Sequence, residues 1–398
     1  MRSLSIITLL LAFFVGKPVV ETRLSNPAYV GATPRLTTDA AGNPLLSWVE
    51  KEGDKAAGFY VARSGDGGRT FGSKIRVQAP ATLSVHAEGM PKLAVKADGT
   101  MLALFEISKP TADSPRASDL LYVTSADGGK TWTMPKPLHR DTTPGKGHSF
   151  SDLTRLPNGE IGIVWLDEKL PDQEGRSVKF VQTKPGGGFT DEVIVDENAC
   201  QCCRTNVFVD ARGQIHLTYR DLLPNGDRDI SHVVSADGGQ TFSRPQVVFA
   251  DHWTVNACPH TGPVVTQAGD AVFATWFSGK EDAVGLRLAK LGKSQLEATV
   301  LSNRAKHPQV VAAGDRLVWL WDESVRKPGQ AADEPMPAYS QKIALRTNPT
   351  GPTTYLTTDA VNASYPVGLA TSHGLLIAYE ERNGEENAVI VYRFVDSL

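Results

Sequence analysis

The string Ser125-Ala126-Asp127-Gly128-Gly129-Lys130-Thr131-Trp132 decides the fold of this chain, because its pattern Ser-x-Asp-x-Gly-x-Thr-aromatic occurs at two further places. The other copies run over residues 64–71 (SGDGGRTF) and 235–242 (SADGGQTF). Each copy follows a run of alternating apolar residues, which predicts the turn of a β-hairpin. The Asp carboxylate can accept backbone N–H bonds across such a turn, and the glycines allow positive φ.

Aligning the chain on these three strings gives a repeating unit of four short strands, and seven units can be traced. Their inner strands are predicted to begin near Pro34, Met90, Ser151, Arg204, Gly262, His307 and Tyr365. The last unit has no fourth strand of its own, whereas a spare apolar segment, Val19 to Leu24, precedes the first unit. We therefore expect an all-β propeller of four-stranded blades, with seven blades rather than six. The N-terminal strand would complete the seventh blade and leave no open sheet edge.

The repeated string resembles the Asp-box, or BNR repeat, of the sialidase-like β-propellers, and the resemblance covers nearly the whole chain. In that family the box is a structural element, so the resemblance implies a fold rather than a chemistry. Typical sialidase catalytic domains have six blades, and the unit count of this chain departs from that number.

The chain has 398 residues and a formal net charge of −3, with no basic stripe, which argues against nucleic acid as a partner. Met1-Arg2-Ser3 followed by the apolar run Leu4 to Val15 is typical of a secretory signal and is short for a membrane span. We expect a signal peptide over residues 1–18, a propeller domain over 19–398, and a secreted or periplasmic protein with no membrane span after signal removal. Phe14 is unfavourable for cleavage near Gly16, so an uncleaved anchor is the alternative. The oligomeric state is not predicted.

The loops that lead into the inner strands should meet on the face opposite the boxes, around the axis of the ring. These loops contain most of the chemically useful residues of the chain. The candidate ligand-binding residues are Arg35, His86, His148, Asp152, Arg304 and His307. The candidate metal ligands are Cys200, Cys202, Cys203, Cys258 and His260.

All four cysteines of the chain lie in two adjacent loops of this kind, which leaves two interpretations open. In an exported protein they would form disulfides, with Cys258 bridged to one of the other three. Cys202 and Cys203 are sequence neighbours, however, which strains such pairing. The alternative is a site for copper or zinc, because thiolate and imidazole ligands suit both metals.

The resemblance also implies an enzymatic alternative, an exo-glycosidase of sialidase type acting on sialylated or other acidic glycans. Such enzymes use three arginines for the substrate carboxylate, a tyrosine nucleophile with a glutamate, and an aspartate as acid and base. Arg35, Arg204 and Arg304 would supply the arginines, with Tyr365, Glu88 and Asp152 as their partners. None of these residues lies in a family motif.

In any enzymatic interpretation the candidate catalytic residues are Glu88, Arg204 and Tyr365. A third possibility is a non-catalytic propeller that binds a protein or a glycan. A second set of residues, the acidic side chains that end the second strands, is interpreted as structural: Glu50, Glu106, Asp167, Asp221, Asp322 and Glu380. Our leading hypothesis is an exported propeller with a central Cys, His and Arg site for a transition metal or a small anionic ligand.

Overall fold

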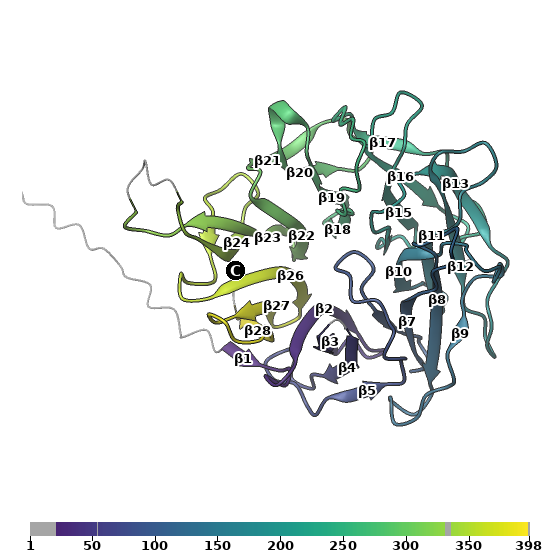
Figure 1. Cartoon of the computed structure of the whole chain (residues 1–398), viewed down its shortest axis with the longest axis horizontal. Helices are drawn as coiled ribbons and strands as arrows, with labels where there is room; N and C mark the ends of the chain where they lie inside the picture. Colours follow the sequence, from purple (N-terminus) through teal and green to yellow (C-terminus); the bar gives the residue numbers. More distant parts are fainter. Residues whose placement is uncertain (1–20, 54, 331–335, 397–398) are drawn as a thin grey trace, which may run out of the picture.

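The computed structural model of the chain describes residues 21–53, 55–330 and 336–396. These residues form seven four-stranded antiparallel sheets that follow one another around a central axis (Figure 1). The all-β propeller with seven blades is therefore confirmed. The expected signal segment 1–18 and the first two residues of the expected closing strand lie outside the described residues.

Six blades use four consecutive strands, with the first strand innermost. The first three blades are β2 (Val30–Thr38), β3 (Pro44–Glu52), β4 (Lys55–Arg63) and β5 (Ile75–Val77); β6 (Lys92–Val95), β7 (Met101–Ser108), β8 (Ser118–Ser125) and β9 (Lys136–Pro137); and β10 (Ser149–Arg155), β11 (Ile161–Leu166), β12 (Arg176–Gln182) and β13 (Val193–Ala199). The next three are β14 (Asn206–Val209), β15 (Ile215–Arg220), β16 (Ile230–Ser235) and β17 (Gln246–Phe249); β18 (Val264–Ala268), β19 (Ala271–Ser278), β20 (Gly285–Lys290) and β21 (Leu296–Leu301); and β22 (Ala305–Ala313), β23 (Arg316–Arg326), β24 (Tyr339–Arg346) and β25 (Thr354–Tyr355).

The seventh blade closes the ring with strands from both ends of the chain. It contains β26 (Asn362–Thr371), β27 (Gly374–Arg382) and β28 (Val389–Val395), and its outer strand is β1 (Glu21–Arg23). Thr22 pairs with Tyr392, and the N–H of Leu24 donates to the carbonyl of Ile390 at 2.8 Å. Figure 1 shows β1 at the outer edge beside β28. The predicted completion of the last blade by an N-terminal strand is confirmed.

The core lies between neighbouring blades. The second strand of each blade contributes a fully buried aromatic side chain to it. These side chains are Trp48, Phe105, Trp165, Tyr219, Trp276, Trp321 and Tyr379. Burying an apolar side chain of this size contributes about 1.5–3 kcal/mol relative to leaving it in water. Equivalent packing at each interface explains why the ring grows by adding blades without a thicker core.

The three boxes form the turns that the sequence predicts. In the second blade Ser125 Oγ donates to Asp127 Oδ1 at 2.8 Å and accepts from the N–H of Gly129 at 2.9 Å. The same carboxylate accepts from the N–H and the hydroxyl of Thr131. In the first blade desolvation raises the pKa of Asp66, but the equivalent bonds from Thr70 and Ser64 together outweigh it and lower the pKa to about 2. The boxes are thus self-contained turns.

Helical structure in the described ranges is limited to one 3-10 turn, Glu281–Ala283. No helix among the described residues is long and apolar enough to span a membrane.

Candidate functional site

A backbone irregularity at the start of the inner strands directs side chains into the axial face. Five non-glycine residues at these positions have φ between 47° and 56°, a region that non-glycine residues rarely adopt: Thr33, Phe150, His260, His307 and Tyr365. Four of these five residues lie where the pairing between the inner strand and the second strand shifts register. The inner strands concerned are β2, β10, β22 and β26. All five residues line one of two cavities on this face. Strained backbone of this kind clusters at functional sites.

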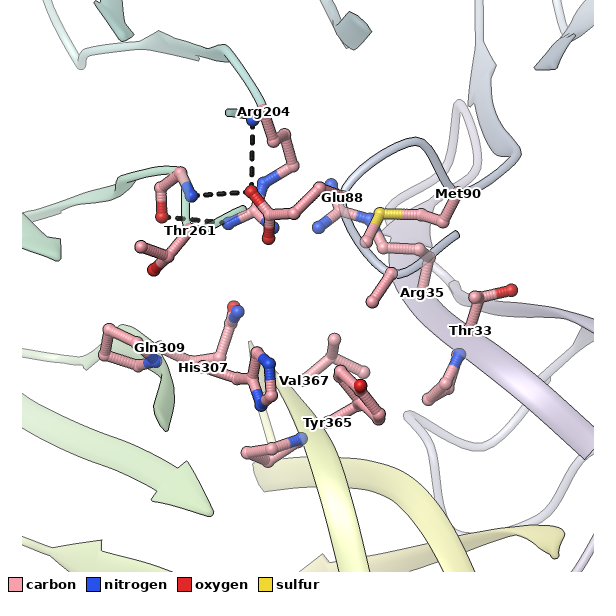
Figure 2. A pocket seen from close by; sticks show the side chains of 15 residues that line it. Thr33, Arg35, Glu88, Met90, Arg204, Thr261, His307, Gln309, Tyr365 and Val367 are labelled. Atoms are coloured by element: carbon pink, nitrogen blue, oxygen red, sulfur yellow. Dashed lines mark hydrogen bonds and ion pairs between the residues drawn. The ribbon is translucent and has the colours of Figure 1, made fainter. Parts of the chain in front are cut away.

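The cavity on the axis is nearly filled by a buried ion pair between Glu88 and Arg204. Arg204 Nη1 donates to Glu88 Oε1 at 2.9 Å. The other carboxylate oxygen accepts from the backbone N–H of Arg204 at 3.1 Å and of Gly262 at 2.6 Å. Figure 2 shows this network, with His307 and Tyr365 on the opposite side of the pocket. Burial alone would raise the pKa of Glu88, but the Arg204 guanidinium and the two N–H groups lower it overall.

Directly beside this pair lie the buried side chains of Lys92 and Asp152 and the partly buried side chain of Arg35. Arg35 Nη2 lies 3.2 Å from Asp152 Oδ1, and Lys92 Nζ donates to the carbonyl of Met90. Burial, reinforced by the nearby Arg35 charge, lowers the pKa of Lys92 to about 7. The remaining free volume of the axial pocket is about 30 Å³, which admits one or two water molecules and no sugar ring.

His307 and Tyr365 are held in the axial pocket by one carboxylate. Asp322 Oδ2 accepts from His307 Nδ1 at 2.7 Å and from the backbone N–H of Tyr365 at 2.7 Å. Burial lowers the pKa of His307, but the Asp322 charge outweighs it and raises the pKa overall. Burial and the Glu380 charge raise the pKa of the Tyr365 phenol. The phenol is therefore held in its neutral form.

Two of the acidic residues that end the second strands link neighbouring blades. Asp322 of the sixth blade binds Tyr365 of the seventh, and Glu380 of the seventh accepts from the N–H of Thr33 in the first at 2.8 Å. These bonds satisfy the N–H groups of residues in the strained conformation described above. The structural interpretation of these carboxylates agrees with such contacts.

The second cavity lies off the axis, between the loops of the second to fifth blades, and has a volume of about 760 Å³. Cys202, Cys258 and His260 line it and offer ligand atoms that lie within 4.8 Å of one another. Behind them Cys200 and Cys203 are buried, and their sulfur atoms lie within 4.8 Å of that of Cys202. The four cysteines carry no disulfide in the structure.

Arginine side chains surround the sulfur cluster. Arg228 Nη1 donates to Cys200 Sγ at 3.1 Å. Hydrogen bonds from Cys202 and Cys203, together with this guanidinium, lower the pKa of Cys200. The pKa of Cys202 is raised because its proton is shared with Cys200, and burial raises that of Cys203. The Arg228 guanidinium and the hydrogen bonds within the cluster therefore favour negative charge at Cys200 over the other two sulfur atoms.

Of the other predicted site residues, His86 lines the off-axis cavity, whereas Arg304 and His148 lie outside both cavities. His86 lies in the off-axis cavity, where its ring centroid is 4.8 Å from that of His260. Arg304 is outside both cavities and donates to the hydroxyl of Tyr339 at 2.7 Å. His148 is fully buried and faces Asp167, away from the axial pocket. Arg35 and Arg204 approach each other, but Arg304 does not join them, so the three arginines form no common carboxylate site.

Two arginines at the off-axis cavity and the sulfur cluster behind it are missing from the predicted site residues. Arg176 lines the cavity and donates to the carbonyls of Gly147 and Leu166. It and Arg228 lie on third strands or in the loops before them, whereas the predicted site residues lie in the loops that lead into inner strands. A search for arginines near the ends of all strands would have found them.

Comparison with known proteins agrees with this architecture. The sialidase of Micromonospora viridifaciens is 24% identical over 203 residues, which is 50% of this chain and 29% of that protein. The chain thus spans less than a third of that relative's length. The intramolecular trans-sialidase of Ruminococcus gnavus has a TM-score of 0.54 at 11% identity, covering 92% of this chain and 94% of its own. An ulvan lyase from a polysaccharide lyase family has a TM-score of 0.57 at 9% identity, covering 94% and 96%.

These structural likenesses concern the fold alone. Residues 45–273 match the family described as the BNR repeat-like domain, and they make up more than half of the chain. The resemblance drawn from the three boxes is therefore confirmed, and the chain belongs to the BNR repeat-like domain family of sialidase-like propellers.

Proposed function

We propose that this chain is an exported propeller protein that binds copper or zinc through Cys200, Cys202, Cys203, Cys258 and His260. The observation that carries the proposal is the arrangement of two ligand triplets that share Cys202. Two sulfur atoms bound to one tetrahedral zinc ion lie about 3.8 Å apart, given a Zn–S distance of about 2.3 Å. The 4.8 Å limit on the sulfur separations is compatible with that spacing after small side-chain movements.

The electrostatic surroundings also support a thiolate site. A metal bound by three thiolates carries net negative charge, and Arg228 and Arg176 supply nearby positive charge. In an oxidising compartment free thiols this close would form disulfides, whereas a bound metal would protect them. His260 and the exposed Cys258 line the off-axis cavity, so an ion could reach the cluster from solvent.

Metal analysis of protein purified without chelators tests this proposal. We expect close to one equivalent of copper or zinc bound by the cysteine cluster of the wild type, whatever other site is occupied. Cys202→Ser should lose it, because Cys202 belongs to both triplets. Gln201→Ala is the matched control, since Gln201 lines the same cavity without a ligand atom for a soft metal, and it should retain the metal. Metal-free protein in which mass spectrometry finds all four cysteines oxidised would overturn the proposal.

A second candidate function is the binding of an acidic glycan in the off-axis cavity. Its volume of about 760 Å³ lies within the range of small-ligand sites, and Arg116, Lys169 and Arg176 line it. The sialidase and polysaccharide lyase relatives make this ligand class reasonable. Titration with sialyllactose should then show binding that Arg116→Ala weakens and Arg304→Ala leaves unchanged. Catalysis at Arg204 is less favoured, because Glu88 already occupies its guanidinium.

A further inference from the structure

Two histidines stack against each other between the second and third blades, outside both cavities described above. His139 follows β9 and His148 precedes β10. Their ring centroids are 3.5 Å apart, and the ring planes differ by 9°. Both residues are buried, with 3% and 0% of their surfaces exposed. Neither ring takes part in the Cys cluster or in the axial pocket.

Each ring is oriented through its Nδ1 atom, which leaves the Nε2 atoms free. His139 Nδ1 lies 2.6 Å from the carbonyl oxygen of Asp141, an acceptor, so this nitrogen carries the proton. His148 Nδ1 lies 3.0 Å from Asp167 Oδ2, and the same reasoning applies. Among the residues that the structure describes, no group hydrogen-bonds to either Nε2 atom, although both are buried. Two buried lone pairs without a donor require an explanation.

A carboxylate completes a set of three ligand atoms. Asp119 on β8 lies with Oδ1 3.4 Å from His139 Nε2, and one ligand atom from each of the three residues lies within 4.8 Å of the others. A histidine whose Nδ1–H donates to a carbonyl or a carboxylate is the usual form of a metal-bound imidazole. We propose that Asp119, His139 and His148 bind one divalent transition metal ion, zinc being the best match, at a site separate from the cysteines.

The stacked rings must reorient before they can share an ion, because lone pairs that lie in two parallel planes do not converge. Two nitrogens on one tetrahedral zinc ion lie about 3.4 Å apart, given a Zn–N distance of about 2.05 Å. The rings must tilt out of their stacked arrangement so that both lone pairs converge. A water molecule would supply the fourth ligand, as in sites with three protein ligands.

A lysine ammonium lies beside the carboxylate on the solvent-exposed side of the site, where a metal ion would enter. Lys109 Nζ lies 3.5 Å from Asp119 Oδ2, and 57% of the Lys109 side chain is exposed. Asp119 itself is partly exposed, whereas both histidines are buried behind it. The ammonium therefore neutralises the carboxylate in the absence of a metal and can move into solvent when an ion binds.

The competing explanation is a proton on His139 shared with Asp119. The separation of 3.4 Å is long for a hydrogen bond between a charged pair. His139 Nδ1 already carries a proton for the Asp141 carbonyl, and no group among the described residues hydrogen-bonds to its buried Nε2. The geometry and the burial both favour a ligand over a proton.

Cobalt titration followed by absorption spectroscopy separates this site from the cysteines. Cobalt bound by thiolates gives charge-transfer bands in the near ultraviolet, whereas cobalt bound by imidazole and carboxylate gives only visible d–d bands. Thiolate-bound cobalt also absorbs in the visible, so the proposed site is read from the visible component that rises without the near-ultraviolet bands. We expect the wild type to show such a component, saturating at one equivalent. His139→Ala should weaken cobalt binding at this site by about tenfold or more. The visible component should therefore be missing at the cobalt concentration that saturates the wild type. The near-ultraviolet bands, where present, should remain.

Two further variants keep the test decisive if His139→Ala fails to fold. Asp119→Asn changes a partly exposed side chain outside the core and should weaken the visible component by a similar factor. Lys109→Met removes the competing ammonium and should strengthen it. The control is His373→Ala, an exposed histidine far from the site in sequence, which should match the wild type. Equal visible bands in the wild type and Asp119→Asn, or none in the wild type, would overturn the proposal.

Discussion

Replacing Glu88 by alanine should destabilise the propeller strongly, because this carboxylate neutralises the positive charge buried at the axis. Glu88 is 3% exposed and Arg204 is 6% exposed. Without Glu88 the Arg204 guanidinium would remain buried and unpaired. The positive charges of Arg35 and Lys92 lie close to it and already repel one another. Breaking a buried ion pair by removing one partner costs about 3–5 kcal/mol.

The hydrogen bonds of Glu88 add to this loss and connect three blades. The carboxylate lies in the loop before β6, and its N–H donors, Arg204 and Gly262, precede β14 and β18. Leaving a buried backbone N–H without a partner costs about 1–3 kcal/mol, although water entering the enlarged pocket offsets part of it. We therefore expect the free energy of unfolding to fall by at least about 3 kcal/mol in Glu88→Ala.

Urea unfolding with linear extrapolation measures this change. The control is Arg304→Ala, which removes an exposed arginine from the same class of loop and should change the free energy by less than about 0.5 kcal/mol. The double variant Glu88→Ala/Arg204→Ala should lose less than the sum of the two single losses, because no unpaired guanidinium remains. A loss below about 1 kcal/mol for Glu88→Ala, or strict additivity in the double variant, would refute the role assigned to the pair.

Two further predictions concern the turns and the links between blades. Ser125→Ala should lower the free energy of unfolding by about 1–3 kcal/mol, because the buried N–H of Gly129 loses its acceptor. Thr131→Ala in the same box should lower it less. Equal losses would contradict the role assigned to the Ser125 hydroxyl. Burial raises the pKa of Glu380 to about 7 in the folded protein, above its unfolded value near 4.3, so its contribution to stability falls as pH rises between these values. Glu380→Gln should therefore compare more favourably with the wild type at pH 8 than at pH 5 in urea unfolding, whereas exposed Glu52→Gln should show no such trend.

The ring could be predicted from the sequence because its determinants are local. The hydrogen bonds of a box join residues at most four positions apart, as between Ser64 and Gly68, so the pattern specifies the turn without the rest of the fold. The spacing of the turns then gives the number of units. Closure by the N-terminal strand followed from a missing strand at one end and a spare one at the other, and β1 beside β28 confirms it.

The contents of the site were predictable only as far as the topology of the ring determines them. Equivalent loops of adjacent blades must lie close together, and the proximity of Cys202, Cys258 and His260 followed from that rule. The direction of a side chain depends instead on partners elsewhere in the sequence. His148 faces away from the axial pocket because Asp167 and His139 hold its ring there, and Arg304 is drawn outward by Tyr339.

The pairing of charges at the axis changes where a ligand can bind in this propeller. Sequence reasoning placed the site at the centre, because the loops meet there and supply arginines, a glutamate and a tyrosine. In the structure Arg204 binds Glu88 and Arg35 binds Asp152, so these groups neutralise one another and leave about 30 Å³ of free space. Breaking these pairs to admit a ligand would expose buried charges at a cost of several kcal/mol each. The off-axis cavity, with about 760 Å³ and a sulfur cluster at its wall, requires no such disruption, which is why we propose metal and glycan binding there and not at the axis.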